Sequence, residues 1–275
     1  MDTNNIAELV RRNENDYISG TTTISKYVDF SLSENIDKIE AYLNSKHTSG
    51  SVDSLGRDKP FFNIVTAATN VWYRATDIDR KHINIKPTKI SDTVAAFLAN
   101  VHLHDWMRRA EFGVTLNDWG RTLARYGSGV LKFIEADGML HSMVVPWNRI
   151  IIDSVQFDND VVIEVLELTP AQLKKRKGYD QDVVNELIES STTRETLGGQ
   201  TKDNKTGYIK IYEVHGELPL SELTGKEKDE GTYVQQMHVV SFQANKESEG
   251  GFDDYTLAKG KEKQNPYMIT HLIKE

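Results

Sequence analysis

The sequence contains no cysteine among its 275 residues, which excludes disulfide bonds, thiolate nucleophiles and every zinc site that needs sulfur. Only histidine and carboxylate side chains remain as metal ligands. Long apolar runs are also lacking, and the first five residues do not show the basic and then apolar pattern of a signal peptide. We therefore expect a protein that is made and used in the cytosol.

An excess of basic residues is absent as well. The chain has 33 Lys and Arg against 41 Asp and Glu, a net charge of −8. Residues 1–150 contain 18 basic and 18 acidic side chains, so the remaining 15 and 23 place the whole excess in residues 151–275. A protein that grips nucleic acid through its phosphates normally carries a basic patch. The composition thus argues against tight electrostatic binding of DNA, and an acidic balance also serves solubility.

The chain begins with a polar, weakly patterned stretch, and apolar residues then recur at helical spacing through the first part of the sequence. Residues 1–30 predict an arm that needs a partner to become ordered. Residues 33–43 predict a short amphipathic helix, and a Gly/Ser-rich connection follows at 47–60. Residues 61–75 predict a buried helix, and residues 91–126 are the clearest helical region.

Three apolar stripes define these last helices. They consist of Ile64, Ala68, Val71 and Ala75 with Trp72 beside them; Val94, Phe97, Leu98 and Val101; and Phe112, Leu116, Trp119, Leu123 and Tyr126. Asn117, Arg121 and Arg125 lie opposite the third stripe and predict a polar outer face. Gly120 costs about 1 kcal/mol relative to Ala inside a helix, which predicts a close approach by another backbone.

From residue 127 the pattern becomes extended. Two β-prone runs, 130–134 and 139–145, flank Asp137-Gly138, a strong hairpin signal. Further strands are predicted at 149–153, 161–168, 208–215, 233–242 and 268–273, with polar loops at 190–207, 217–231 and 243–254. Thr169-Pro170-Ala171-Gln172 has the pattern of a capping box that opens a helix through Lys177, and Asp180 or Asp182 starts a second one through Ile188.

None of the motifs that carry chemistry is complete. His102 and His104 are two apart on a predicted helix and point about 200° away from each other, so they cannot chelate one ion. The acidic residues near 158–160 and 253–254, and Asp137, are better explained as turn formers than as oxygen ligands of a cation. No phosphate-binding loop or nucleophile elbow is present. The basic run 174–177 suits the last turn of a capped helix better than a nucleic-acid contact.

Three stretches resemble the portal proteins of tailed bacteriophages. They are Arg109-Ala110-Glu111-Phe112-Gly113-Val114-Thr115-Leu116-Asn117-Asp118-Trp119-Gly120-Arg121, Tyr126-Gly127-Ser128-Gly129-Val130-Leu131-Lys132 and Val144-Val145-Pro146-Trp147-Asn148. In that family a helix ends in a Tyr-Gly-Ser-like turn and feeds a hairpin of the wing domain. Residues 168–173, 209–219 and 265–267 look like later stretches of the same segment, so the resemblance covers roughly residues 60–275.

The resemblance implies a non-enzymatic virion component without cofactor or metal. It implies a ring, usually of twelve subunits, at one capsid vertex, where it is the channel for DNA packaging and ejection and the platform for tail attachment. The partners would be further copies of the chain, the major capsid protein, terminase, head–tail adaptor proteins and the double-stranded DNA in the channel, with no membrane. The location would be the portal vertex of the virion, and the host cytoplasm during assembly.

The expected fold is α+β, with a helical N-terminal part followed by a β-rich, wing-like domain with short helices. We expect an arm and short helix at 1–59, the helical part of the wing at 60–127 and its β-rich part at 128–275, continuing into stem and clip. Arg121 and Arg125 are the candidate subunit-interface residues, and no catalytic, cofactor-binding or metal residue is assigned. The alternatives are a metal-dependent hydrolase or nuclease and another non-enzymatic virion adaptor.

Overall fold

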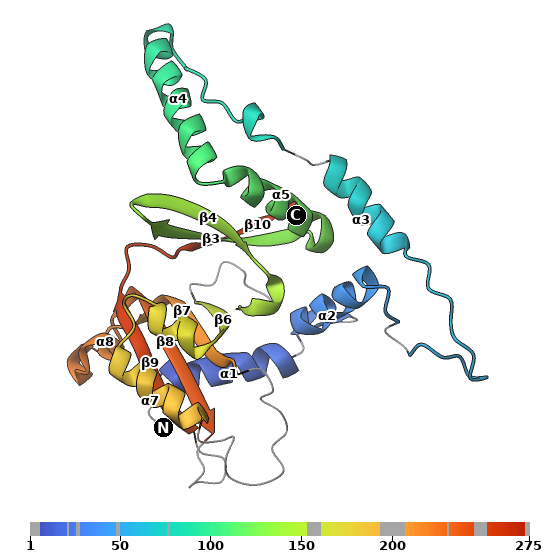
Figure 1. Cartoon of the computed structure of the whole chain (residues 1–275), viewed down its shortest axis with the longest axis vertical. Helices are drawn as coiled ribbons and strands as arrows, with labels where there is room; N and C mark the ends of the chain where they lie inside the picture. The colour runs from blue at the N-terminus through green and yellow to red at the C-terminus, as the bar shows by residue number, and fades with distance from the viewer. Residues whose placement is uncertain are drawn as a thin grey trace. The chain divides into compact units, whose positions relative to one another are not determined.

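The computed structural model describes residues 6–20, 22–25, 28–47, 50–75, 78–152, 161–192, 207–229, 231–244 and 252–272. Most helices precede most strands, so the fold is α+β, as the sequence predicted (Figure 1). The chain forms two compact units, each built from separate stretches. Unit 1 combines Met1–Ser31 with Arg149–Asn265, and unit 2 combines Leu32–Asn148 with Pro266–Glu275. The functional division at residues 59 and 127 stays a prediction.

Unit 1 is organised around a five-stranded antiparallel sheet in which neighbours in the chain are neighbours in space. Its strands are β5 (Ile150–Ile151), β6 (Val162–Leu168), β7 (Ile209–Pro219), β8 (Tyr233–Ala244) and β9 (Phe252–Lys261). Side chains alternate between its two faces. One face packs against α6 (Pro170–Lys175) and α7 (Gln181–Thr192), and the other against α1 (Ile6–Ser19). The sheet is therefore the middle layer of three.

The helix starts on the first face follow the sequence signals. The Thr169 hydroxyl accepts from the Gln172 backbone N–H, and the Gln172 side chain accepts from the Thr169 N–H, which confirms the capping box. Helix α6 ends at Lys175 rather than at the predicted Lys177. Asp180 caps α7, since its Oδ1 accepts from the backbone N–H groups of Asp182 and Val183. Helix α7 continues past the predicted Ile188 to Thr192.

Helix α1 corrects the prediction of an arm that needs a partner. Ile6, Ala7 and Val10 are buried, and Ile6 and Val10 belong to one apolar cluster with sheet residues such as Tyr212. Glu14 accepts a hydrogen bond from the Tyr212 hydroxyl at 2.6 Å and pairs with Lys210. The stretch orders on the same chain because its few apolar residues fall on one helical face.

The remaining parts of unit 1 are short. Strands β1 (Thr22–Ser25) and β2 (Val28–Phe30) form a two-stranded sheet. The predicted acidic loop holds α8 (Ser221–Thr224) and the turn η5 (Glu227–Asp229), and Glu217 belongs to β7 instead. Much of the predicted loops at 190–207 and 243–254 lies outside the described residues. The prediction of a loop was wrong from Phe252 onward, where β9 begins.

Unit 2 contains most of the helices and a three-stranded sheet. Its elements are α2 (Leu32–Leu43), α3 (Ile64–Ala75), η1 (Arg80–His82), η2 (Ile90–Asp92), α4 (Thr93–Arg109), α5 (Phe112–Tyr126), β3 (Ser128–Ala136), β4 (Met139–Val145) and β10 (Tyr267–His271), with the short η3 (Trp147–Arg149) at its end. The strand order is β10-β3-β4, so the predicted last strand returns to pair with β3. Helix α5 packs on this sheet, where the Trp119 indole donates to the Thr270 hydroxyl at 2.8 Å.

The turns of unit 2 confirm two sequence signals. Asp137 and Gly138 have φ values of 54° and 71°, the left-handed pair that a two-residue hairpin of type I′ requires. Gly127, with φ 73°, ends α5 directly before β3.

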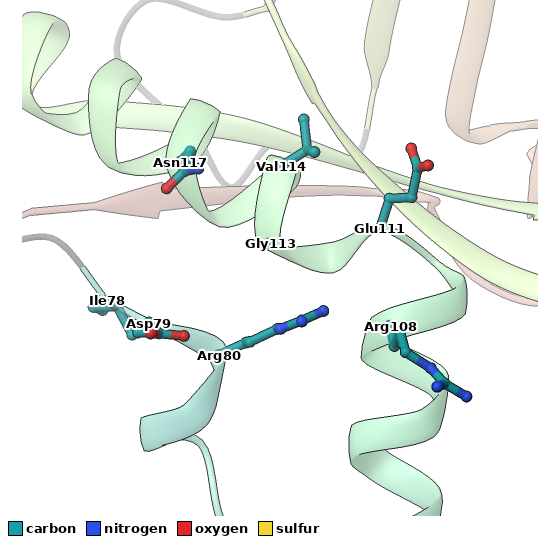
Figure 2. A pocket seen from close by; sticks show the side chains of 8 residues that line it. All are labelled: Ile78, Asp79, Arg80, Arg108, Glu111, Gly113, Val114 and Asn117. Carbon is teal, nitrogen blue, oxygen red and sulfur yellow. The ribbon is translucent and has the colours of Figure 1, made fainter.

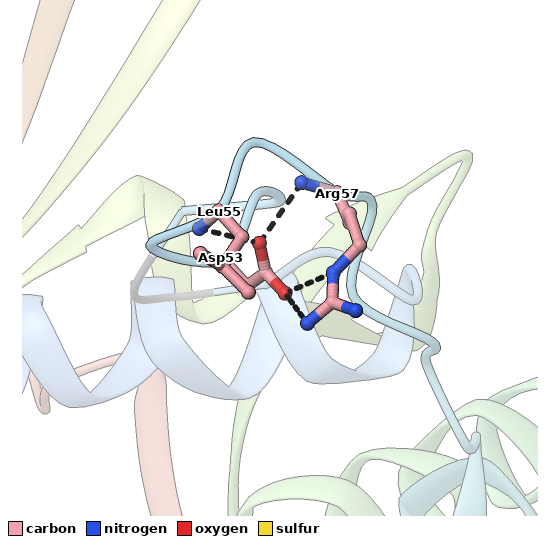
Figure 3. Close-up of polar contacts among 3 residues, drawn as sticks. All are labelled: Asp53, Leu55 and Arg57. Atoms are coloured by element: carbon pink, nitrogen blue, oxygen red, sulfur yellow. Dashed lines mark hydrogen bonds and ion pairs between the residues drawn. The ribbon is translucent and has the colours of Figure 1, made fainter.

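The connection at 47–60 contains an ordered turn around Asp53 (Figure 3). Its carboxylate accepts from the backbone N–H groups of Leu55 and Arg57 at 2.8 and 2.9 Å and from the Arg57 guanidinium at 3.0 Å. The hydrogen bond from the Arg57 N–H, followed by those from Leu55 and the Arg57 side chain, holds the pKa of Asp53 below its ordinary value. An isolated bridge between Val52 and Asp58 closes the loop.

Candidate functional site

The apolar faces of α3 and α4 are exposed, which corrects the prediction that α3 is a buried helix. Among the described residues, α3 has no buried side chain, and Ile64, Val71 and Trp72 are 72%, 69% and 55% exposed. The stripe of α4 is exposed too, with Val94 at 71% and Phe97 at 66%. Helical spacing correctly predicted both helices, but it does not say whether the face is covered by the same chain or by another molecule.

Helix α5 contacts both α3 and α4, and it carries the predicted interface residues. Asn117, Arg121 and Arg125 are exposed on its outer side, as their spacing predicted. The Arg121 guanidinium lies 5.6 Å from the ring centre of Tyr73 on α3 and 3.9 Å from the Asp118 carboxylate. Their role between subunits stays a prediction. Gly120 faces the Tyr73 ring, which a Cβ would meet at an ordinary 3.7 Å, so the close neighbour is a side chain and not a backbone.

A pocket of about 550 Å³ lies in unit 2 beside the junction of α4 and α5. It is lined by Ile78, Asp79, Arg80, Arg108, Glu111, Gly113, Val114 and Asn117 (Figure 2). Figure 2 shows Arg80 reaching into this space, whereas the side chains of Arg108 and Glu111 point away from it. Arg108 pairs with Asp105 at 2.7 Å. Two cationic and two anionic side chains therefore balance one another, and the lining selects no ligand charge.

Unit 1 contains a buried group of charged side chains between the sheet and its helices. Glu164 and Glu213 face each other across β6 and β7, and both are buried. Arg149 donates to Glu164 at 2.7 Å, and the Tyr179 hydroxyl donates to Glu213 at 3.2 Å. Burial, followed by the charge of Glu213, raises the pKa of Tyr179. Paired carboxylates can do acid–base chemistry, but here they are shut away from solvent, so the group holds the core together.

Two histidines of unit 1 are also buried. His215 pairs with Glu262 at 3.0 Å, and His238 lies 2.8 Å from the Gln236 side-chain oxygen. Burial, with repulsion from Lys259 second, lowers the pKa of His238 to about 4. Both lie on paired strands, His215 on β7 and His238 on β8. His82 lies in η1.

The other motifs examined in the sequence do not converge. His104 contacts the Asn84 side chain at 3.1 Å, and Asp105 pairs with Arg108 and Arg109. Asp254 was expected in a turn but lies on β9 and pairs with Arg11 at 2.6 Å. Residues 153–160, including the acidic run, lie outside the described residues. Within the part of the chain that is described, no three His, Asp or Glu side chains are grouped to hold a metal ion, and no helix is long and apolar enough to cross a membrane.

The edge of the small sheet is protected against pairing with another strand. The Trp106 indole donates to the backbone oxygen of Leu140 at 2.9 Å, and the Thr115 hydroxyl donates to that of Ser142 at 2.7 Å. Both acceptors belong to β4, which is the sheet edge. These bonds use carbonyls that would otherwise template an added strand.

The chain matches no protein family and no curated protein sequence. The geometry of the described residues is therefore what defines the candidate site, and its most distinctive feature is the pair of exposed apolar helix faces. Residues 64–73 and 93–104 contain no charged side chain, so the sequence marks both helices as apolar but does not indicate that their faces are exposed.

Proposed function

We propose that this protein is the wing-type segment of a tailed-phage portal protein. It forms a ring at one capsid vertex, passes DNA during packaging and ejection, and provides the platform for tail attachment. It is a virion component and not an enzyme. Its partners are copies of itself, the major capsid protein, terminase, adaptor proteins and the DNA in the channel.

The local structure of the resembling stretches supports this proposal. Tyr126-Gly127-Ser128 ends α5 in a left-handed glycine and leads directly into β3. The Val144-Val145-Pro146 step ends β4, so the second and third stretches bracket one hairpin. This is the order of helix, turn and hairpin that the resemblance implies for a wing.

The observation that carries the proposal is the exposed apolar surface of α3 and α4. Monomeric soluble proteins rarely expose large contiguous apolar patches, and such patches mark surfaces of association. A protein whose main exposed feature is apolar and helical is suited to assembly. The net negative charge also supports the proposal. It repels the DNA phosphates and weakens their binding, so that DNA can move through the channel without being held.

Electron microscopy of the assembled protein tests the proposal. The purified chain, at increasing concentration, is expected to form closed rings with a central opening, and native mass spectrometry is expected to give a multiple of the 31.2 kDa subunit. A chain that stays monomeric or dimeric at all concentrations would contradict the proposal. So would stoichiometric binding of a divalent metal with hydrolytic activity on DNA.

A further inference from the structure

The exposed faces of α3 and of the η2–α4 segment repeat one spacing. In both segments, the distances along the sequence between successive apolar residues of the face are four, three, one and three positions. The α3 face consists of Ile64, Ala68, Val71, Trp72 and Ala75, and the α4 face consists of Ile90, Val94, Phe97, Leu98 and Val101. This spacing places each set on one side of its helix over about three turns. The two faces thus have equal lengths.

The two faces differ in the sizes of their side chains. The α4 face is uniformly bulky, with Phe97 and Leu98 at its centre. The α3 face is uneven, because the bulky Trp72 at its centre lies between the small residues Ala68 and Ala75, and all three are exposed. Bulky side chains of one helix pack well where small side chains of another leave room. The faces are therefore complementary to each other more than either is to itself.

The area involved matches the needs of an interface. Ile90 is 94% exposed, and the other members of the α4 face are between 51% and 71% exposed. Together with the α3 face, roughly 1,000 Å² of apolar surface would leave water, close to the lower end of the 1,200–2,000 Å² buried by specific interfaces. The surrounding polar rim would add to this area.

We propose that the α4 face of one copy of this chain packs on the α3 face of the next copy. The inference rests on the proposed function, because a closed ring needs a heterologous contact in which two different surfaces of each subunit meet. Both surfaces belong to unit 2, so each copy offers one to either neighbour. The occupant of each face is a second copy of the chain.

Cysteine cross-linking tests this contact directly, because the natural chain contains no cysteine. The variants are Val71→Cys on α3, Leu98→Cys on α4 and the chain with both substitutions. Under mild oxidation the double variant is expected to give a ladder of covalent oligomers. An equimolar mixture of the single variants is expected to give dimers only, and each single variant alone to remain uncross-linked.

Four results would overturn the inference. Dimers from Leu98→Cys alone would indicate a symmetric contact of two α4 faces. A linked pair within one chain, without a ladder, would show that the faces cover each other in the monomer. Rings in micrographs without any cross-link would reject this interface while leaving the proposed function intact, whereas a monomer at all concentrations would reject both.

A charged substitution gives an independent measurement. Phe97→Glu is expected to weaken self-association at least about 100-fold in analytical ultracentrifugation, because the contact would bury a carboxylate without a partner. Leu55→Glu, at a position 73% exposed in the 47–60 connection of the same unit, is the matched control and should associate as the parent does. Unchanged circular dichroism of Phe97→Glu shows that the monomer still folds. Equal association of the two variants would contradict the proposal.

Discussion

At the scale of single residues, the charged and polar side chains inside unit 1 set the stability of its sheet. Glu164 is only 1% exposed, and its ion pair with Arg149 at 2.7 Å has the same length as the exposed pair between Arg108 and Asp105. The two pairs differ in their surroundings. The Arg149 side chain is 38% exposed, but the Glu164 carboxylate is buried, so removal of Arg149 leaves a poorly solvated charge, whereas in the exposed pair water replaces the partner.

Arg149→Met is therefore expected to lower the free energy of unfolding by about 3 kcal/mol, measured by urea denaturation at pH 7. Arg108→Met, the matched control, should cost less than about 1 kcal/mol. The double variant Arg149→Met/Glu164→Met should recover most of the loss, because it removes the buried charge as well. Equal losses for the two single variants would show that Glu164 is solvated.

His238 makes stability depend on pH. Burial lowers its pKa from 6.5 to about 4, so folding favours the neutral imidazole. This contribution is fully present above pH 6.5 and is lost as the pH falls toward 4. We expect the free energy of unfolding to fall by about 2 kcal/mol between pH 7.5 and 5.

The variant His238→Gln should show a flatter pH profile over the same range, and His102→Gln, which replaces an exposed histidine, should keep the slope of the parent. A slope that is unaltered in His238→Gln would assign the pH dependence to other groups.

At the scale of elements, substitutions in helix α1 test how strongly this helix packs on the sheet of unit 1. Val10 is fully buried against the sheet, whereas Ile18 on the same helix is 64% exposed. Val10→Ala is expected to cost about 2 kcal/mol of unfolding free energy through lost burial and the cavity left behind. Ile18→Ala should change it by less than about 0.5 kcal/mol. Similar effects of both changes would mean that α1 is undocked in solution.

Two glycines in unit 2 give opposite expectations. Gly120 lies inside α5 with ordinary room for a methyl group, so Gly120→Ala should stabilise the protein by about 0.5–1 kcal/mol. Gly138 has φ 71°, so Gly138→Ala should destabilise it by about 1 kcal/mol or more. Thermal unfolding followed by tryptophan fluorescence measures both changes. A loss of stability in Gly120→Ala would show that the Tyr73 ring cannot yield.

Local signals account for the elements that the sequence predicts well. The hairpin at Asp137-Gly138 and the capping box at Thr169 each depend on residues that are close together in the sequence, so the local pattern is enough to predict them. Helix α1 escapes prediction because its partners lie more than 140 residues away. Strand β9 begins with Phe252-Asp253-Asp254, and those acidic side chains conceal a strand whose pairing with β8 stabilises it.

The candidate site shows a different limit of sequence patterns. The stripes on α3 and α4 are plain in the sequence, and they predict burial. The helical periodicity of apolar residues indicates that one face of a helix is removed from water, but it does not indicate whether the same chain or another molecule covers that face. The exposure of Phe97 and Trp72 can be recognised only in the folded structure, where no other part of the described chain covers them fully. Arg121 and Arg125 could be assigned to an outer face, but an outer face alone does not identify its partner.

At the scale of the whole molecule, the two units carry different spectroscopic probes. All four tryptophans, Trp72, Trp106, Trp119 and Trp147, belong to unit 2. Their fluorescence reports that unit, and far-ultraviolet circular dichroism reports both. Val10→Ala is therefore expected to shift the dichroism transition while leaving the fluorescence transition within about 0.5 kcal/mol. Identical shifts by both probes would show that the units unfold as one.

The last strand should affect tryptophans far upstream in the chain. Ending the chain after Asn265 removes β10, its pairing with β3 and the hydrogen bond from Trp119 to Thr270. The fluorescence transition is expected to move to lower urea, since β3 would become an unpaired edge. Thr270→Val keeps the strand but removes the two hydrogen bonds of the Thr270 hydroxyl, with Trp119 and with the Gly129 backbone oxygen, and should cost about 1–2 kcal/mol. A fluorescence transition that truncation leaves in place would exclude a structural role for β10.

The return of β10 also sets the order of events during synthesis. Helix α1 leaves the ribosome well before the sheet on which it packs, which begins near residue 150, and unit 2 lacks its last strand until residues 267–271 have emerged. At about 5–20 residues per second, α1 waits roughly 7–30 seconds for its partner. Unit 1 is incomplete until β9 (Phe252–Lys261) has been translated, and unit 2 until β10 (Tyr267–His271) has been translated. Slow translation therefore prolongs the time during which the apolar faces of the incomplete units can aggregate.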